Sequence, residues 1–211
     1  MACRVLISFL AVALILGFQA EPASSQQSPS PSTVPTTAAP LESGETVNGT
    51  YHNPTIGFRY KIPFGWVDRT EEMRDASTDP PKASVLLAVF ERPPEAKGDT
   101  VNSAVIIAVE SASSYPGLKT AAQYFGPVTE LTTAKGFQAV ADPYDFPVDG
   151  RPIVRRDFIR SMGSIGMHQS TLALVTKGWI VSFTFLAGSD DEVTALIEPL
   201  AFERPRKPAH K

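Results

Sequence analysis

Histidines are the residues of this sequence best suited to bind a metal ion or to act as a base. Three occur, His52, His168 and His210, and none shows a recurrent ligand spacing such as H-x-H or H-E-x-x-H. His52 and His168 are the candidate metal ligands, because folding can bring them together or place His52 beside Asp68. The alternative is that His52 belongs to a turn and that His168 ends a strand and faces water. No cofactor is expected from this pattern.

The sequence contains no recognisable catalytic nucleophile. Its single cysteine, Cys3, lies in an N-terminal segment that we expect to be removed, so the remaining chain has no disulfide, thiolate metal site or cysteine nucleophile. The segment GSIG at 163–166 has the wrong spacing for a G-x-S-x-G nucleophile elbow, and no glycine-rich phosphate-binding motif occurs. We therefore expect no enzymatic activity. The alternative is a hydrolase, or a small-ligand or metal-binding protein, whose site is assembled from scattered Asp, Ser and His residues.

The candidate partner-binding residues are Trp66, Arg156 and Arg160. The two arginines fall on one face of a predicted strand, because successive strand residues point to opposite faces. Charges on this strand suit either an edge protected against aggregation or a docking patch for an anion or a partner. The arginines are not interleaved with a series of aromatic residues, so nucleic-acid binding is not expected. Trp66 follows a glycine in a predicted tight turn, where it is either a core anchor or an exposed contact for a partner.

The N-terminus predicts export to a periplasmic or extracellular location. Arg4 is followed by an apolar run of 14 residues, Val5–Phe18, which is short for a membrane span and suits a signal peptide over residues 1–20. An uncleaved N-terminal membrane anchor is the alternative, because Phe18 stands where cleavage sites prefer a small residue. The formal net charge of −3 is too small to indicate a polyanionic partner.

Composition divides the rest of the chain into three parts. Residues 21–49 are rich in Pro, Ser and Thr and poor in large apolar residues, which predicts a disordered spacer. Residues 50–203 predict one globular domain, and residues 204–211 predict a frayed basic tail. Asn48-Gly49-Thr50 is a formal N-glycosylation sequon, which matters only in a host that uses that pathway.

Hydrophobic periodicity predicts short strands and two helices in this domain. Phe58–Ile62 alternates apolar and polar residues, which predicts a half-buried strand near the sheet edge. The apolar runs 84–90 and 104–109 predict two adjacent central strands, and turn residues at 149–150 and 177–178 predict two hairpins. Helices are predicted near 118–125, interrupted at Gly126-Pro127, and after a capping box at residues 189–192. The fold class is therefore α+β, an antiparallel sheet of about six to seven strands flanked by helices.

The stretch Tyr51–Trp66, YHNPTIGFRYKIPFGW, resembles the start of the Mog/PsbP-like α/β/α sandwich family. The pattern Y-x-N/D-x-x-x-G-F-x-(Y/F)-x-x-P-x-G-W is carried by Tyr51, Asn53, Gly57, Phe58, Tyr60, Pro63, Gly65 and Trp66. The order of the later strands and helices is similar too, so that the resemblance covers about residues 51–202. The family includes a photosystem II extrinsic subunit, a Ran-binding nuclear import factor and exported bacterial proteins of unknown role. The resemblance implies a binding or accessory role, by analogy of fold.

The function expected from these observations is that of an exported, non-enzymatic accessory or binding domain. Its partner would be an unknown protein or a component of the cell envelope, and not a nucleic acid. We expect no stable membrane span after cleavage, and we expect a monomer. The photosystem role of one family member is not implied, because the N-terminus lacks the Ser/Arg-rich character of a transit peptide.

Overall fold

The computed structural model describes residues 41–75, 83–93, 95–96, 98–163 and 165–203. The predicted signal peptide, most of the predicted spacer and the predicted tail lie outside these residues. Composition predicts that the domain begins at residue 50. The first strand, β1 (Glu45–Val47), lies before that boundary, within the predicted spacer. Asn48 and Gly49 have φ angles of 50° and 72°, as a type I′ turn requires, and they join β1 to β2 (Thr50–Asn53). The first two residues of the sequon therefore form a hairpin turn.

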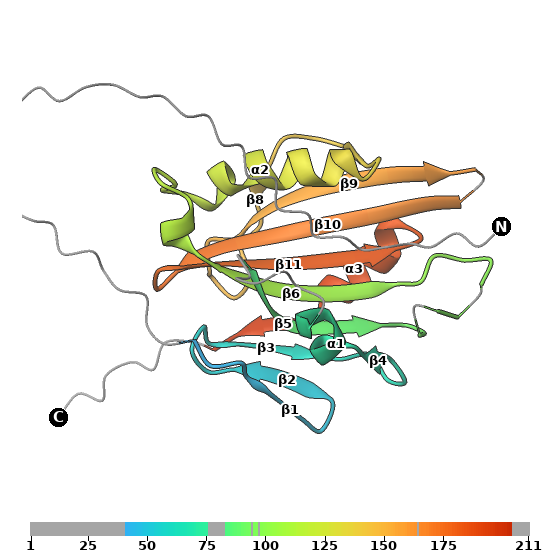
Figure 1. The fold of residues 1–211 in the computed structure, drawn as a ribbon, viewed down its shortest axis with the longest axis horizontal. Coiled ribbons are helices and arrows are strands. Elements are labelled where there is room, and N and C mark those ends of the chain that lie inside the picture. Colours follow the sequence, from blue (N-terminus) through green and yellow to red (C-terminus); the bar gives the residue numbers. More distant parts are fainter. Residues whose placement is uncertain (1–40, 76–82, 94, 97, 164, 204–211) are drawn as a thin grey trace, which may run out of the picture.

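Two antiparallel sheets make up the domain (Figure 1). The smaller sheet has four strands in the order β1-β2-β3-β12, where β3 is Phe58–Lys61 and β12 is Leu200–Phe202. The larger sheet has eight strands in the order β4-β5-β6-β11-β10-β9-β7, and β8 pairs with β9 beside this path. Its strands are Val67–Asp68 (β4), Ala83–Phe90 (β5), Ala104–Ser111 (β6), Gln138–Ala139 (β7), Tyr144–Asp145 (β8), Val154–Met162 (β9), Ile165–Thr176 (β10) and Trp179–Ala187 (β11).

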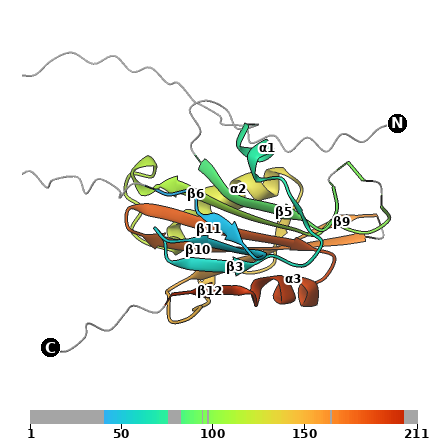
Figure 2. The same cartoon turned by 90° about the horizontal axis from the view of Figure 1, so that it is seen from below.

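Helices lie on both faces of the larger sheet (Figure 2). Helices α1 (Thr70–Asp75) and α2 (Ala121–Ala134) cover one face, and a short 3-10 turn, η1 (Ala112–Ser114), precedes α2. Helix α3 (Asp190–Ile197) and the smaller sheet cover the other face. None of the helices described is long and apolar enough to cross a membrane. This arrangement confirms the predicted α+β class of an antiparallel sheet flanked by helices.

The main core lies between the two sheets and α3. Phe58 and Tyr60 of the smaller sheet face Phe183 and Phe185 of β11, and all four side chains are almost completely buried. The rings of Phe58 and Phe183 meet edge to face with their centroids 5.1 Å apart. On the opposite face of the same strand, Ile180 packs against α2. Successive side chains of β11 therefore pack into the two cores that lie on opposite faces of the larger sheet.

The stretch Phe58–Ile62, predicted to form a half-buried strand near the sheet edge, forms β3, the strand next to the edge strand β12 of the smaller sheet. Strand β3 lies between β2 and β12 of the smaller sheet, where its side chains alternate between buried and exposed. Period-two alternation identifies one buried face, but it does not identify the strands that lie on either side. The predicted central pair is confirmed, because β5 pairs with β6, and β6 pairs in turn with β11. The two predicted hairpins are also present, with Asp149 and Lys177 at φ angles of 48° and 50°.

The predicted interruption of the middle helix at Gly126-Pro127 is wrong. Helix α2 runs through Pro127 without a break. A proline within a helix removes one hydrogen bond and costs about 3 kcal/mol, but burial of Tyr124 and Phe125 against the sheet offsets this cost. The helix begins at a capping box in which Thr120 and Gln123 satisfy each other's backbone amides. Tertiary packing therefore overrides the local proline signal.

Candidate binding site

A tight turn at Pro63–Trp66 follows strand β3 and presents two aromatic side chains. The Trp66 amide donates a hydrogen bond of 3.3 Å to the Pro63 carbonyl oxygen, and Gly65 has a φ of +81°. This is the conformation in which glycine is favoured, because a side chain at positive φ is strained. The turn places Phe64 at its tip, and the chain then continues directly into β4.

Phe64 is fully exposed, at 105% of its reference surface, whereas Trp66 is partly buried and packs against the main core. Val47, beside the turn that joins β1 and β2, is also exposed. An isolated exposed apolar residue is common on protein surfaces. Phe64 differs because both ends of its turn are fixed, one by β3 and the other by β4, so the ring is held away from the core.

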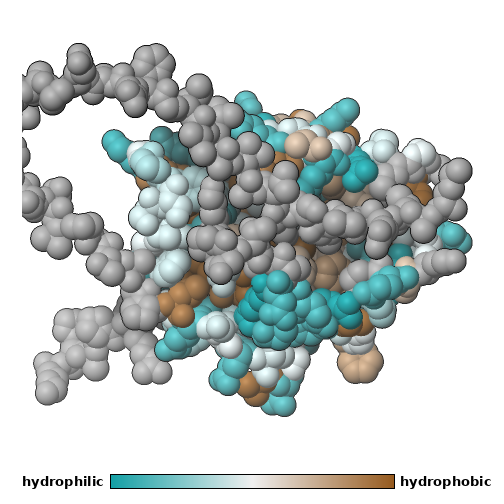
Figure 3. Space-filling view, viewed as in Figure 1, coloured by the Kyte–Doolittle hydropathy of each residue, from teal (hydrophilic) through white to brown (hydrophobic). Residues whose placement is uncertain are grey.

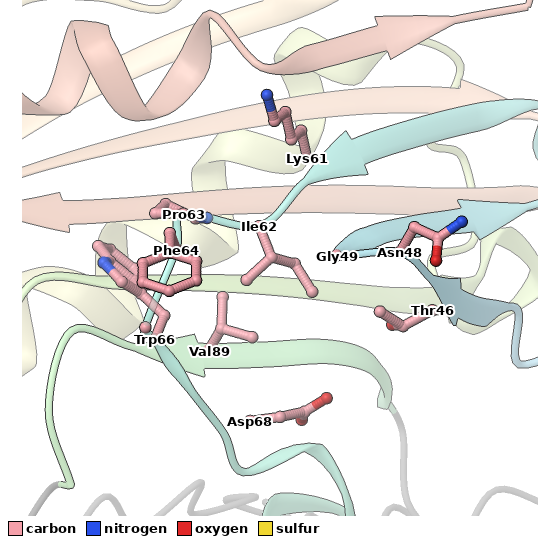
Figure 4. A pocket seen from close by; sticks show the side chains of 11 residues that line it. Thr46, Asn48, Gly49, Lys61, Ile62, Pro63, Phe64, Trp66, Asp68 and Val89 are labelled. Carbon is pink, nitrogen blue, oxygen red and sulfur yellow. The ribbon is translucent and has the colours of Figure 1, made fainter.

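Beside this turn is a hollow of about 400 Å³, which we call the aromatic hollow (Figure 4). It opens between β1, an edge of the smaller sheet, and β4, an edge of the larger sheet. Its apolar side chains include Ile62, Phe64, Trp66 and Val89. Its full lining is Thr46, Asn48, Gly49, Lys61, Ile62, Pro63, Phe64, Gly65, Trp66, Asp68 and Val89.

The aromatic hollow has one carboxylate in its lining, that of Asp68. Asp68 lies at the rim, where its Oδ1 atom accepts hydrogen bonds from the Thr70 amide and hydroxyl at 2.9 and 2.6 Å. Lys61 belongs to the lining, but its ammonium group points away from the other labelled side chains (Figure 4). Among the described residues, no lysine, arginine or histidine forms an ion pair with Asp68.

The structure places Trp66 partly in the core, and contact of this residue with a partner stays a prediction. Part of its surface contacts the main core, and another part lines the aromatic hollow. Sequence reasoning missed Phe64, which is the more exposed of the two residues. The signal was present, since Pro63 and Gly65 flank Phe64 in the manner of a turn that exposes its central residue.

The two candidate arginines lie beside α2, away from the aromatic hollow. Arg156 donates hydrogen bonds to the Thr129 hydroxyl at 2.8 Å and to the Ala141 carbonyl oxygen at 3.1 Å. The Arg160 guanidinium lies 5.9 Å from the centre of the Phe137 ring. Their common face is as predicted, but the edge-strand interpretation is wrong, because β9 pairs with β10 on one side and with β7 and β8 on the other. A role of these arginines in binding a partner stays a prediction.

The two candidate metal ligands belong to different sheets. His52 lies on β2 of the smaller sheet, opposite Arg59. His168 lies on β10 of the larger sheet, and its Nδ1 is 2.7 Å from Asp190 Oδ1 at the start of α3. Across the residues that the structure describes, no group of three or more His, Cys, Asp or Glu side chains is arranged to hold a metal ion. Among the described residues, Asp190 is the acidic residue with which His168 forms an ion pair.

Ser170 and His168 share a face of β10, but they do not form a nucleophile-base pair. Ser170 donates its hydroxyl hydrogen to Asp157. Asp157 also accepts from Arg155 Nε and from the Tyr144 hydroxyl, each at 2.8 Å. The His168 ring is turned toward Asp190, so a hydrolytic site made from these Ser and His residues lacks its first requirement, a hydrogen bond from the nucleophile to the base.

A second polar cluster lies between η1, α2 and the larger sheet. The Glu110 carboxylate accepts hydrogen bonds from the hydroxyl groups of Tyr115 and Tyr124. Burial, the hydrogen bonds and the negative charge of Glu110 all raise the pKa values of both tyrosines. Both hydroxyl groups therefore stay protonated and act as donors that hold α2 on the sheet.

The face that carries α1 and α2 is mixed in polarity. Figure 3 shows hydrophilic residues gathered over α1 and hydrophobic residues exposed at other places on this face. Two ion pairs lie at this surface: Arg74–Glu71 at 2.5 Å within α1, and Arg69–Glu95 at 2.6 Å, whose arginine directly precedes the helix. These exposed pairs stabilise the domain by at most about 1 kcal/mol each, so we treat them as a solvated surface.

Comparison with known proteins finds no matching family model and no matching curated protein. Solved structures that are similar to this chain include cyanobacterial PsbP (CyanoP) from Synechocystis sp. PCC 6803, with 14% identity, a TM-score of 0.48, and coverage of 73% of this chain and 91% of that chain. LpqN of Mycobacterium tuberculosis, described as involved in cell envelope biogenesis, has 14% identity, a TM-score of 0.35, and coverage of 70% and 83%.

PA94 of Pseudomonas aeruginosa, described as a protein of unknown function, has 13% identity, a TM-score of 0.33, and coverage of 67% of this chain and 83% of that chain. Similarity at this level concerns the fold and carries no argument about activity or partners. A PsbP protein, from the family that the stretch Tyr51–Trp66 resembles, is thus among the solved structures to which this chain is similar.

Proposed function

We propose that this protein is a non-enzymatic binding domain that docks a protein partner at the aromatic hollow. The observation that supports this proposal is the full exposure of Phe64 on a fixed turn, directly beside a hollow lined by Ile62, Trp66 and Val89. Aromatic anchors that enter or border a pocket are typical of the residues that dominate protein interfaces. The chain thus offers a protruding ring and a concave apolar surface at the same place.

Burial of Phe64 would contribute a large share of the binding free energy. Complete burial of a phenylalanine side chain stabilises a complex by about 1.5 to 3 kcal/mol. A change of about 1.4 kcal/mol corresponds to a tenfold change in affinity, so loss of this ring weakens binding by roughly tenfold to a hundredfold. The fold itself loses little, because the ring contacts solvent in the free protein.

Site-specific photocross-linking in the source organism tests the proposal. Phe64 is replaced by p-benzoylphenylalanine in the full chain, and the same residue is placed at Leu131 as a control, because Leu131 is also an exposed apolar residue but lies on α2. We expect a discrete cross-linked protein from position 64 and none of that mass from position 131. Competition by the unlabelled wild-type chain should remove the product, whereas competition by the Phe64→Gln variant should not.

Two results would contradict the proposal. One is equal cross-linking from both positions, which indicates non-specific contact. The other is the absence of any product from position 64 at native expression. The control variant Leu131→Gln should compete as well as the wild type, because it makes the same change of residue type at the other site.

The predicted export forms part of this proposal, since it decides which partners the domain meets. The supporting observation is the apolar run Val5–Phe18 followed by polar sequence from Glu21. The mature protein is then expected to begin near Glu21. Mass spectrometry of the N-terminus checks this expectation, and an intact Met1 together with retention in the membrane would instead indicate an anchor.

A further inference from the structure

Strand β1 borders the aromatic hollow and has one unpaired edge. It lies at the end of the smaller sheet and pairs only with β2 among the described strands. Val47 and Thr50 flank the two-residue turn, so they form the hydrogen-bonded pair next to it. The next pair, Thr46 and Tyr51, is then a non-hydrogen-bonded pair, and the backbone N–H and C=O of Thr46 point away from β2. They are available to another strand.

A strand added at this edge would place one side chain in the aromatic hollow. Thr46 lines the hollow and lies on the same face of the sheet as its partner Tyr51, which is buried. In an antiparallel pair, directly opposite residues point to the same face. The residue opposite Thr46 would therefore point toward Trp66 and Val89, and its two neighbours would point to the outer face.

The charge of the hollow selects the residue that would occupy it. Asp68 lies at the rim, and among the described residues its only hydrogen bonds are those that Oδ1 accepts from Thr70. Glu45, the neighbour of Thr46 on β1, points to the outer face of the sheet and does not line the hollow, so Asp68 is the carboxylate that faces an inserted side chain. A lysine or arginine has an aliphatic stem that packs on apolar surface and a cationic head that stays polar. Its stem fits the walls at Ile62 and Trp66, and its head fits the carboxylate.

We propose that the partner docks through an extended segment that adds to the edge of β1 and inserts a Lys or Arg side chain into the aromatic hollow. This inference rests on the proposed function and specifies the chemistry of the partner. Strand addition takes affinity from backbone hydrogen bonds, while pockets for alternate side chains provide specificity. Electrostatic complementarity at Asp68 would exclude segments with an acidic residue at that position.

Two substitutions separate the backbone contribution from the side-chain contribution. Thr46→Pro removes the outward N–H without disturbing the bonds between β1 and β2, and Thr46→Val keeps that N–H as the control. Asp68→Asn removes the charge but keeps an Oδ1 atom that accepts from Thr70. Circular dichroism should show that all three variants of the full chain remain folded, because each change lies on an edge strand and faces solvent.

The probes are acetyl-TVTKTVT-amide and copies with glutamate or norleucine in place of the lysine. Binding is measured by chemical-shift titration of the Trp66 indole N–H. We expect the lysine peptide to bind about tenfold more tightly than the glutamate peptide, and norleucine to fall between them. Asp68→Asn should reduce the preference for lysine over norleucine by about threefold to fivefold. Thr46→Pro should bind every peptide about tenfold more weakly than Thr46→Val does, because only the valine variant keeps the outward N–H.

Equal binding of the lysine and glutamate peptides would overturn the inference, as would full binding by Thr46→Pro. The photocross-link from position 64 distinguishes this failure from that of the proposed function. If the cross-link persists in the Thr46→Pro background, the aromatic hollow binds a protein but not by strand addition. Binding to vesicles of anionic phospholipid that depends on Phe64, without any peptide shift, would assign this surface to a membrane and overturn both proposals.

Discussion

The Tyr60 hydroxyl donates a hydrogen bond of 3.0 Å to the backbone carbonyl oxygen of Leu196, which joins the third strand to the last helix of the domain. Tyr60 is completely buried, and Leu196 lies in the last turn of α3, where carbonyl oxygens lack partners within the helix. The tyrosine therefore satisfies a polar group that the helix leaves open. This contact connects residues 136 positions apart in the sequence.

Tyr60→Phe should destabilise the domain by about 1 to 2 kcal/mol, because the Leu196 carbonyl oxygen stays buried without its donor. The ring itself remains, so contacts with the core are kept. Urea unfolding followed by circular dichroism measures the change in the free energy of unfolding. An unchanged midpoint would show that water replaces the tyrosine as donor.

The stability of the domain should fall as the pH rises above about 10, the ordinary pKa of tyrosine. Above that pH the unfolded chain releases tyrosine protons that the native state keeps, so the free energy of unfolding decreases with pH. Burial of Lys135 lowers its pKa and acts in the opposite sense, but it is a single group. Burial raises the pKa of Tyr144 to about 12 and also raises those of Tyr51, Tyr60, Tyr115 and Tyr124.

The free energy of unfolding in urea, measured at pH values of about 8, 9, 10 and 11 on both sides of the ordinary tyrosine pKa, checks this dependence. Absorbance near 295 nm should show that native tyrosines ionise later than those of the unfolded chain. A free energy of unfolding that stays constant over this range would contradict the protected state of these hydroxyl groups.

Glu110→Ala should cost about 2 to 3 kcal/mol of stability, because the hydroxyl groups of Tyr115 and Tyr124 lose their shared acceptor. Tyr124 is the more buried of the two, so its unsatisfied hydroxyl carries most of the cost. Glu110→Gln is the matched control, since its amide oxygen still accepts one hydrogen bond, and it should cost less than half as much. Equal losses for the two variants would assign the effect to the charge of Glu110 instead.

Gly65→Ala should destabilise the domain by about 1 to 2 kcal/mol and weaken partner binding, because a side chain is strained at a φ of +81°. The space around Gly65 is open, so steric contact does not contribute. Gly126→Ala is the matched control: its surroundings are equally open, but it lies within α2. There alanine should stabilise by about 0.5 to 1 kcal/mol. The same sign for both variants would contradict the role of backbone conformation at Gly65.

Some of the fold was accessible to sequence reasoning because it depends on local signals. The turns at Asp149-Gly150 and Lys177-Gly178 have the type I′ residues that short hairpins need, and the structure contains both hairpins. Ser189 caps α3 as its spacing predicts, accepting from the Glu192 amide at 3.3 Å. Such signals act between residues that are close in the chain.

The candidate site was accessible only in part. The sequence indicated Trp66 and its turn, but it gave no reason to connect Trp66 with Thr46 or Val89, which come from other strands. It also paired His52 and His168 as candidate metal ligands, whereas the structure places them on different sheets. Proximity between distant residues depends on strand order, and one sequence does not specify that order.

Sequence alone determined the fold class of this protein, its turns and many of the residues that face the core, because hydrophobic periodicity and turn chemistry are local properties. Tertiary structure decided that the strands divide into two sheets, that α2 continues through Pro127, and that Phe64 stands beside a hollow between two sheet edges. Each of these depends on packing between segments far apart in the chain. The free energy of that packing comes from burying their surfaces together, and no single segment contains it.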